Sequence, residues 1–319
     1  MKTHKYVIIL LDSLTPAFCY YEPRKKKEKI SLMNLKKAVE YCREHDLFAT
    51  VVYPEYQLES AKQKLLDKFV HIRILPLHRA DELTEGDILT VNYEPEKEQF
   101  EKIPVNTYLN IVLRIKMSQI RDLEMLYYRY RNRFCRLTII LTDIETADED
   151  ALNRYRLHLS KVKDYIYRSW NFDWEFQMSI LTDRIFLNQM NHCNAGITHF
   201  TIAPNGKFYI CPGFYMDNPK QTIGSFTEEI RIANSHLLDI EHSPVCSVCD
   251  CFQCKRCIYL NKRTTLETNI PSHTQCVVSH HERNISGILL EKLQNRGCLS
   301  NLPKIKPLFY LDPMENIGN

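Results

Sequence analysis

The stretch of this sequence with the residues best suited to chemistry is Cys246-Ser-Val-Cys249-Asp-Cys251-Phe-Gln-Cys254-Lys-Arg-Cys257, which we name the cysteine ladder. It places five cysteines within twelve residues, and three more stand nearby at Cys193, Cys211 and Cys276. Eight thiolates are the number that two four-coordinate metal centres require. Pairs separated by two residues let both sulfurs reach one ion or cluster from a single turn of backbone. The spacing therefore predicts metal ligation by these eight cysteines.

Two kinds of metal centre fit an all-cysteine ligand set, because tetrahedral thiolate sites suit both zinc and iron–sulfur clusters. Zinc ribbons tend to carry two Cys-x2-Cys pairs separated by about a dozen or more residues. A compressed ladder with single partners far to either side favours one or two [4Fe–4S] clusters, and zinc is the alternative. Nothing in the sequence indicates secretion, so ligation is favoured over disulfide bonds.

The bulk composition limits the function classes. The chain has 319 residues, is 44% hydrophobic and carries a net charge of +3. The length suits one large or two medium domains, and the charge is too small to indicate a nucleic-acid partner. The apolar run Tyr6–Leu11 is too short for a signal-peptide core or a membrane span. We therefore expect a cytoplasmic protein without a membrane partner.

Glycine is scarce in the first part of the chain, where Gly86 is the only glycine before residue 195. Loops that cradle nucleotide phosphates need several glycines for close approach of the backbone. The sequence therefore lacks the usual nucleotide-binding loops here, and no residue is assigned to an organic cofactor. The basic run Arg24–Lys29 could meet an acidic partner or a phosphate, but a solvated loop is the favoured interpretation.

The elements that must position the cysteines begin with alternating apolar runs and helix-period segments over the first 170 residues. We expect strands at 6–11, 48–53, 70–75, 87–91, 108–115 and 137–141. Helices are expected from Ser31, around residue 61, near Phe100, from Ser118, and after a capping box at Thr146-x-x-Glu149. The repeated alternation predicts an α/β fold with a parallel sheet, either a partial (β/α)6 barrel or an open doubly wound sheet.

The remainder of the chain has a different pattern. Residues 198–203 and 207–210 read as a hairpin around Pro204-Asn205-Gly206, with Cys193 before it and Cys211 just after it. Tyr259–Thr268 is polar without a clear core face, and a helix is expected at Ile285–Leu293. The predicted organisation is an α/β domain at 1–175, a small Cys-rich α+β metal-binding domain at 176–280, and a helix and tail at 281–319.

The order of Cys193, Gly206, Cys211, the ladder and Cys276 resembles the SPASM domain. That domain follows a (β/α)6 radical SAM core in enzymes that modify ribosomally made peptides, and it carries two auxiliary [4Fe–4S] clusters. The text around Cys193-Asn-Ala-Gly, Ala203-Pro-Asn-Gly-Lys-Phe-Tyr-Ile-Cys211-Pro-Gly and Cys254-Lys-Arg-Cys257 is most similar to the CXXX repeat peptide maturase family. The resemblance covers about residues 1–280 and implies a radical SAM-like domain followed by a SPASM-like domain.

The resemblance also implies an interleaved ligand pattern. One cluster would take Cys193, Cys211 and Cys257, and the other would take Cys246, Cys249, Cys254 and Cys276. The ladder deviates from the SPASM spacing, so Cys251 completes the first site, replaces Cys254, or is spare. His192, His280 and His281 are substitute-ligand candidates, although a surface position is favoured for each.

The sequence departs from the radical SAM pattern where the initiating cluster would bind. Three cysteines are required after the first strand, whereas Leu14–Glu22 contains only Cys19, and Tyr53-Pro-Glu55 stands where a Gly-Gly-Glu-like turn is expected. One thiolate cannot hold that cluster, so independent cleavage of S-adenosylmethionine is not expected. A buried thiol is the favoured role for Cys19.

The resemblance therefore implies an accessory or pseudo-enzyme subunit for post-translational modification of a cysteine-repeat precursor peptide. Its partners would be the precursor peptide and an active radical SAM/SPASM enzyme, and whether the chain is itself catalytic is left open. The alternative is a zinc-stabilised peptide- or protein-binding module without redox chemistry.

Overall fold

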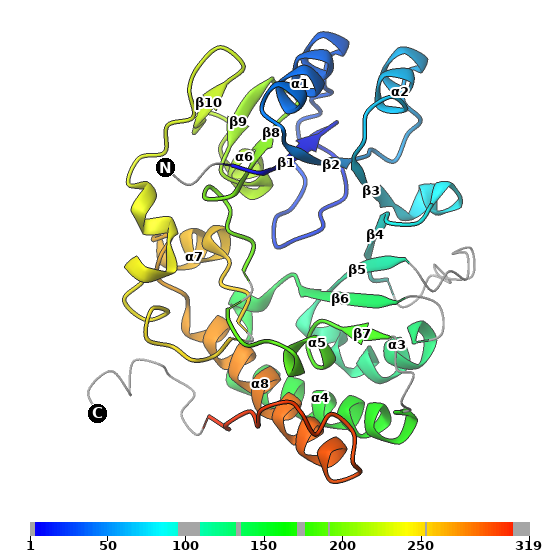
Figure 1. Ribbon diagram of the computed structural model, residues 1–319, viewed down its shortest axis with the longest axis vertical. Coiled ribbons are helices and arrows are strands. Elements are labelled where there is room, and N and C mark those ends of the chain that lie inside the picture. The colour runs from blue at the N-terminus through cyan, green and yellow to red at the C-terminus, as the bar shows by residue number, and fades with distance from the viewer. Residues whose placement is uncertain are drawn as a thin grey trace. The chain divides into compact units, whose positions relative to one another are not determined.

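The computed structural model describes residues 4–94, 109–131, 135–170, 176–190, 192–252 and 254–308 (Figure 1). The chain forms two compact units. The first unit comprises Met1–Pro104 and Asn194–His242, and the second comprises Val105–Cys193 and Ser243–Asn319. The domain boundaries that the sequence predicted at residues 175 and 280 remain predictions. The helical piece expected near Phe100 lies outside the described residues.

The first unit is built on a mostly parallel sheet, which confirms the predicted mixed α/β class. Its strands follow the order β10-β9-β8-β1-β2-β3-β4. The parallel strands are β1 (Tyr6–Leu10), β2 (Phe48–Val52), β3 (Ile72–Pro76), β4 (Ile88–Asn92) and β8 (His199–Ile202). The antiparallel strands at the edge are β9 (Lys207–Tyr209) and β10 (Gly224–Ser225). The expected hairpin is confirmed as β8–β9, and β8 joins it to the N-terminal strands through β1.

Helices α1 (Leu32–Glu44) and α2 (Ser60–Leu66) and the 3-10 segment η1 (Leu77–Glu82) connect the first four strands. The predicted start of α1 is confirmed, since the Ser31 hydroxyl accepts a hydrogen bond from the Asn34 amide at 3.0 Å. Its inward residues pack with β1 and β2 in one apolar core, as the helical period predicted. The unit also contains α6 (Pro212–Asp217), η4 (Ser235–Leu238) and η5 (Ile240–His242).

The hairpin turn depends on Gly206, whose φ of 76° lies in the left-handed region. A Cβ atom at this position would approach the Asn34 side chain to 3.0 Å. The Asn34 side-chain amide donates to the Pro204 carbonyl at 3.1 Å, so the turn is fastened to α1. This contact fixes where β9 begins, and Cys211 stands two residues after the end of that strand as the N-cap of α6.

The second unit contains parallel strands β5 (Asn110–Ile115), β6 (Arg136–Leu141) and β7 (Gln177–Met178), paired in that order. Its connecting elements are η2 (Met117–Asp122), α3 (Leu123–Tyr130), η3 (Ile144–Thr146), α4 (Glu149–Ser169) and α5 (Thr182–Ile185). The predicted apolar stripe of α4 is confirmed as buried. The predicted capping box at Thr146 is wrong: the Asp148 carboxylate caps the helix by accepting from the Ala151 amide at 2.8 Å, while Thr146 ends η3.

Two helices of this unit differ from the sequence prediction. Residues expected to be polar without a core face form α7 (Ile258–Thr265), whose first turn is buried. The tail helix is α8 (His273–Gln294), which begins twelve residues before the predicted start at Ile285 because Ser272 caps it. Its first half was missed because many of its buried residues are polar. Figure 1 shows α8 running along α4, and the two helices pack together.

The surface position expected for two histidines on α8 is also wrong. His280 is 1% exposed and His281 is 5% exposed, whereas His192 is half-buried. Within the described part of the chain, no helix has both the length and the hydropathy that crossing a bilayer requires.

Candidate metal centre

The cysteine ladder lies in the second unit and begins with a turn organised by Ser243. The buried Ser243 hydroxyl accepts a hydrogen bond from the Cys246 amide at 3.3 Å and donates one to the Asn269 carbonyl at 2.5 Å. The Cys249 amide then donates to the Cys246 carbonyl at 3.4 Å. These contacts hold the first Cys-x2-Cys pair in a tight turn, as close ligand pairs require.

Backbone amides point at two of the ladder sulfurs. The Cys251 amide donates to the Cys249 Sγ at 3.4 Å, and the Arg256 amide donates to the Cys254 Sγ at 3.3 Å. In both cases the donor lies two residues after the cysteine, so the same local turn occurs twice. Hydrogen bonds from amides favour the thiolate over the thiol. The ladder backbone therefore presents these sulfurs as acceptors, the form in which cysteine binds a metal.

Cys276 joins the ladder from the first turn of α8. Burial raises the pKa of the Cys276 thiol, and the neighbouring sulfurs of Cys254, Cys246, Cys249 and Cys251 raise it further. Such mutual effects require the groups to lie near one another. We name these residues the five-sulfur set: Cys246, Cys249, Cys251, Cys254 and Cys276. The structure thus brings together five of the eight predicted ligands within one unit.

The sulfurs of this set do not have equivalent surroundings. The Cys251 Sγ, in a residue only 1% exposed, donates to the Ser279 carbonyl of α8 at 3.8 Å. A thiolate ligand has no proton to donate, so this contact belongs to the thiol form. Cys251 therefore fastens the ladder to α8, while the other four sulfurs equal the number that one four-coordinate centre needs.

Burial is the main influence on the acidity of the set. It raises the pKa of the Cys249 thiol to about 11 and also raises the pKa values of Cys246 and Cys251. The metal-free chain consequently keeps these thiols protonated near pH 7. Metal binding must then release protons, which makes retention of a metal weaker as the pH falls.

Zinc and iron–sulfur centres require different spacings of their ligands. Within the described ranges, no three or more His, Cys, Asp or Glu side chains are placed to hold a single metal ion. One tetrahedral zinc would draw its four sulfurs to about 3.8 Å from one another, given Zn–S bonds of about 2.3 Å. A four-iron cluster carries its ligands on separate irons and spaces them farther apart. The all-cysteine donor set suits either centre.

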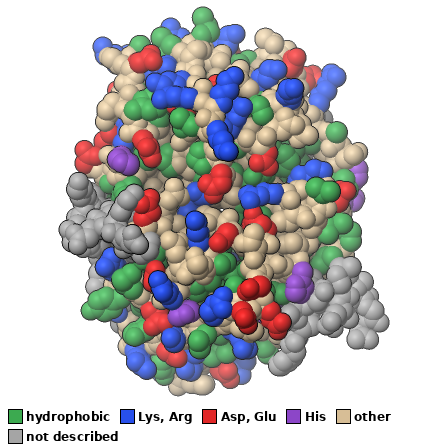
Figure 2. All heavy atoms as spheres, turned by 180° about the vertical axis from the view of Figure 1, so that it is seen from behind, with side chains coloured by type: hydrophobic (Ala, Val, Ile, Leu, Met, Phe, Trp, Pro, Cys, Tyr) green, Lys and Arg blue, Asp and Glu red, His purple; other side chains and the backbone are tan. Residues whose placement is uncertain are grey.

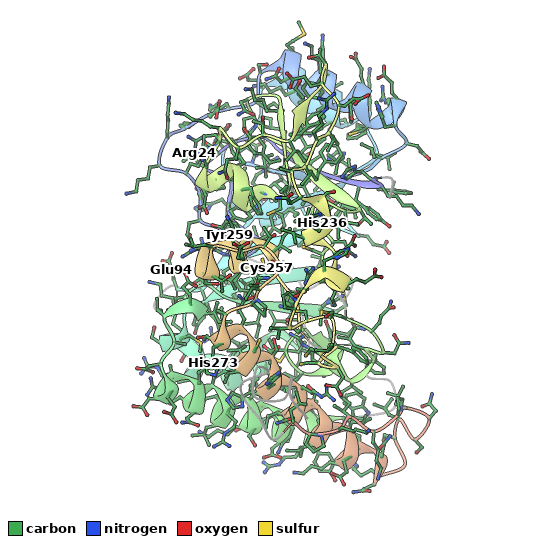
Figure 3. The ribbon with its side chains drawn as sticks, turned by 90° about the vertical axis from the view of Figure 1, so that its left-hand side faces the viewer. Arg24, Glu94, His236, Cys257, Tyr259 and His273 are labelled. Carbon is green, nitrogen blue, oxygen red and sulfur yellow. The ribbon has the colours of Figure 1, made fainter. Side chains whose placement is uncertain are left out.

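The other three predicted ligands occupy different places. Cys257 is the N-cap of α7 and accepts from the Leu260 amide at 3.5 Å; Figure 3 shows it at the start of that helix. Cys193 is exposed and is the last residue of the segment Val105–Cys193, which belongs to the second unit. Cys211 belongs to the first unit, as the N-cap of α6. The trio is divided between the two units, and its role as a second ligand set stays a prediction.

The structure describes all twelve cysteines and pairs none of them in a disulfide. Cys42 is buried in α1, and burial raises the pKa of its thiol to about 12. Cys19 is half-buried in the loop after β1.

The crystal structure of Streptococcus suis SuiB bound to precursor peptide SuiA is similar to this chain at a TM-score of 0.39 and 13% sequence identity. The similarity covers 85% of this chain and 75% of that one. No protein-family model and no curated protein matches the sequence. A likeness of this degree does not establish a family.

Sequence reasoning missed the residues that hold the ladder in place. Arg283 on α8 binds Asp250 within the ladder, with Nη1 and Nη2 at 3.0 and 3.1 Å from the two carboxylate oxygens. Cys276, Ser279 and Arg283 stand at positions i, i+3 and i+7 of α8 and therefore share one face. That spacing was present in the sequence, but it becomes a signal only once the helix is known to begin before Cys276.

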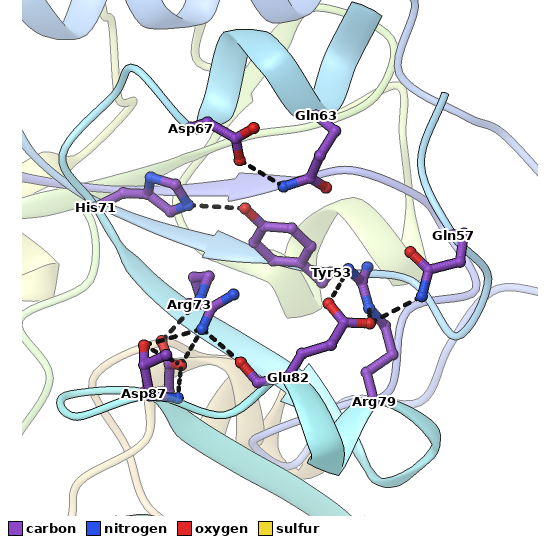
Figure 4. Close-up of polar contacts among 10 residues, drawn as sticks. Tyr53, Gln57, Gln63, Asp67, His71, Arg73, Arg79, Glu82 and Asp87 are labelled. Carbon is purple, nitrogen blue, oxygen red and sulfur yellow. Dashed lines mark hydrogen bonds and ion pairs between the residues drawn. The ribbon is translucent and has the colours of Figure 1, made fainter. Parts of the chain in front are cut away.

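A second group of polar side chains lies at the ends of β2 and β3 in the first unit (Figure 4). Arg73 forms an ion pair with Asp87, and Arg79 forms one with Glu82. The Tyr53 hydroxyl bonds to His71 Nε2 at 2.9 Å. These side chains largely satisfy one another within the unit. Their arrangement accounts for how η1 is held against the sheet and indicates a structural role.

Proposed function

We propose that this chain is an iron–sulfur protein that takes part in modifying a ribosomally synthesised precursor peptide. Its ligands would be Cys246, Cys249, Cys254 and Cys276, with Cys251 as a protonated support. The observation that carries this proposal is the gathering of the five-sulfur set by the ladder and the first turn of α8. A cluster held by these four cysteines would have every iron ligated and would supply an electron acceptor.

We further propose an accessory role beside an active radical SAM/SPASM enzyme. The support is sequence-based: the loop after β1 contains Cys19 alone, where a radical SAM cluster needs three cysteines. The chain would then contribute its sulfur set and a docking surface, while the partner enzyme cleaves S-adenosylmethionine. The test is to reconstitute the purified chain anaerobically with iron and sulfide and assay it alone. Formation of 5′-deoxyadenosine without a partner would overturn the accessory role.

The basic run gives the proposed peptide a place to dock in the first unit. Arg24–Lys29 is held in place, since the Ser13 hydroxyl donates to the Lys26 carbonyl at 2.8 Å and accepts from the Glu28 amide at 2.8 Å. Lys25, Lys26 and Lys27 remain exposed. An ordered loop with three exposed ammonium groups fits a peptide segment rich in Asp and Glu.

Two observations favour an acidic peptide over a nucleic acid at this loop. The Tyr56 ring, which could otherwise stack a base, is covered by Lys27 and Lys29 at 4.9 and 4.1 Å from its centroid. On the face drawn in Figure 2, acidic and basic side chains are interspersed over the described surface. Replacing Lys25, Lys26 and Lys27 by Ala should weaken binding of a fluorescent decaglutamate peptide. The matched control replaces Lys36, Lys37 and Lys64, and an equal loss in both would contradict the assignment.

The second candidate function is a zinc-stabilised binding module, and the all-cysteine donor set is what favours it. Anaerobic purification followed by iron, acid-labile sulfide and zinc analysis separates the two. Iron and sulfide in equal amounts with visible absorption support the first function. Stoichiometric zinc without visible absorption supports the second.

A further inference from the structure

Three arginines of the second unit are buried around the five-sulfur set: Arg184 is 3% exposed, Arg256 is 2% exposed and Arg283 is 5% exposed. A buried guanidinium is costly unless negative charge or hydrogen-bond acceptors compensate it. Arg184 forms an ion pair with Glu282, and Arg283 forms one with Asp250. Both arginines also lie near enough to Cys251 to favour its thiolate. Two of the three guanidinium groups beside the sulfur set are therefore balanced by carboxylates.

Arg283 connects the ladder to α8 by several contacts at once. Its Nη1 donates to the Asp250 carbonyl at 2.5 Å, in addition to the two-pronged contact with the Asp250 carboxylate. Its Nε donates to the Lys306 carbonyl at 3.0 Å. Asp250 stands between Cys249 and Cys251, so this arginine fixes the middle of the ladder. The planar fork is needed for this geometry, and a lysine cannot reproduce it.

Arg256 has a different relation to the sulfurs. Its backbone amide donates to the Cys254 Sγ at 3.3 Å, and its side chain is 2% exposed within the ladder. Its backbone φ of 36° lies outside the regions that non-glycine residues prefer. Strain of this kind persists where the surroundings demand a particular side-chain position. Arg256 therefore stands at a sharp turn of the ladder with its guanidinium buried.

We propose that Arg283 is a positioning residue that holds the ladder against α8, and that Arg256 stabilises the more negatively charged state of the metal centre. The inference rests on the proposed metal site and names two residues that act on it. Reduction adds one negative charge to a thiolate-bound cluster, so a nearby guanidinium raises the reduction potential. Loss of the charge lowers that potential, and loss of the fork loosens the site.

The test uses the full chain with reconstituted iron and sulfide, titrated with dithionite in the presence of redox mediators. Arg256→Gln should shift the reduction equilibrium about tenfold toward the oxidised form, which is a potential lower by about 59 mV for one electron. Arg256→Lys should restore most of the shift because it keeps the charge. Lys292→Gln removes a half-exposed charge that lies about 14 Å from Arg283 along the axis of α8. This variant should leave the reduction potential unchanged.

Arg283→Lys should release iron to a chelator several-fold faster than the unmodified protein, with a potential close to normal. An Arg256→Gln potential equal to that of Lys292→Gln, or unaltered iron release in Arg283→Lys, would overturn the corresponding assignment. Circular dichroism of each variant separates loss of fold from loss of the site, and the two lysine variants keep the charge in place.

The outcome also separates this inference from the proposed function. If the unmodified protein binds zinc alone, the iron–sulfur function fails, and zinc retention against EDTA then tests the arginines. Faster zinc loss in both arginine variants than in Lys292→Gln supports their roles, and equal loss contradicts them. If the protein binds neither metal, both proposals are wrong.

Discussion

Glu282→Gln should be among the most destabilising single changes in the second unit. The Glu282 carboxylate is 4% exposed, pairs with Arg184 and accepts from the Tyr155 hydroxyl at 2.8 Å. The substitution keeps the shape of the side chain but leaves the Arg184 guanidinium without its balancing charge. Breaking one side of a buried ion pair costs roughly 3–5 kcal/mol, because an uncompensated charge remains in a low-dielectric interior.

The assay is urea unfolding followed by tryptophan fluorescence, to which Trp170, 8% exposed in the same unit, contributes. The matched control is Lys292→Gln, which breaks a half-exposed pair with Asp164 on the same helix and should cost under about 1 kcal/mol. Replacing Arg184 and Glu282 together by Leu should recover much of the loss, because no charge is then left alone. If Glu282→Gln costs no more than Lys292→Gln, the buried ion pair does not stabilise α8 as reasoned.

Two further changes test the fold that positions the site. Burial lowers the pKa of His281 to about 4, aided by the nearby charges of Arg156 and His280. Its folded form prefers the neutral ring, so the stability it contributes is present above pH 6.5 and is lost as the pH falls toward 4. His281→Gln should therefore reduce the difference in melting temperature between pH 7 and pH 4.5, and an unchanged difference would contradict the assignment. Gly206→Ala should cost about 1–2 kcal/mol from its positive φ, with a further cost from the contact with Asn34. Gly86 shares a positive φ of 88° but a Cβ there meets nothing within 4 Å, so thermal unfolding should show Gly206→Ala to be the more destabilising of the two variants.

The sequence predicted those parts of the fold that leave a periodic apolar pattern. The strand β1 and the stripe from Leu152 to Ile166 on α4 were recognisable because their buried residues are apolar and regularly spaced. The hairpin was recognisable from its Pro-Asn-Gly turn. Its parallel pairing with β1 was not, because Tyr6 and His199 are far apart in sequence and no local pattern encodes the contact.

The sequence named the sulfur atoms of the proposed site but not the residues that support them. Cys-x2-Cys spacing identified the ladder, whereas α7 was missed because the buried Asn261 interrupts its apolar face. Asn261 is satisfied there by donating to the Thr268 carbonyl and accepting from Gln275. Arg283 was missed for a similar reason, since a charged residue is expected at the surface until its partner is known.

The central claim is that four of the five gathered sulfurs bind a cluster while Cys251 stays a thiol. Iron and acid-labile sulfide counts on the reconstituted protein, on Cys254→Ser and on Cys251→Ser test it most directly. We expect equal amounts of iron and sulfide in the unmodified protein, a loss of most of both in Cys254→Ser, and near-complete retention in Cys251→Ser, whose hydroxyl can still donate to the Ser279 carbonyl. Iron counts that fall equally in both variants, or an unmodified protein that takes up no iron, would contradict it.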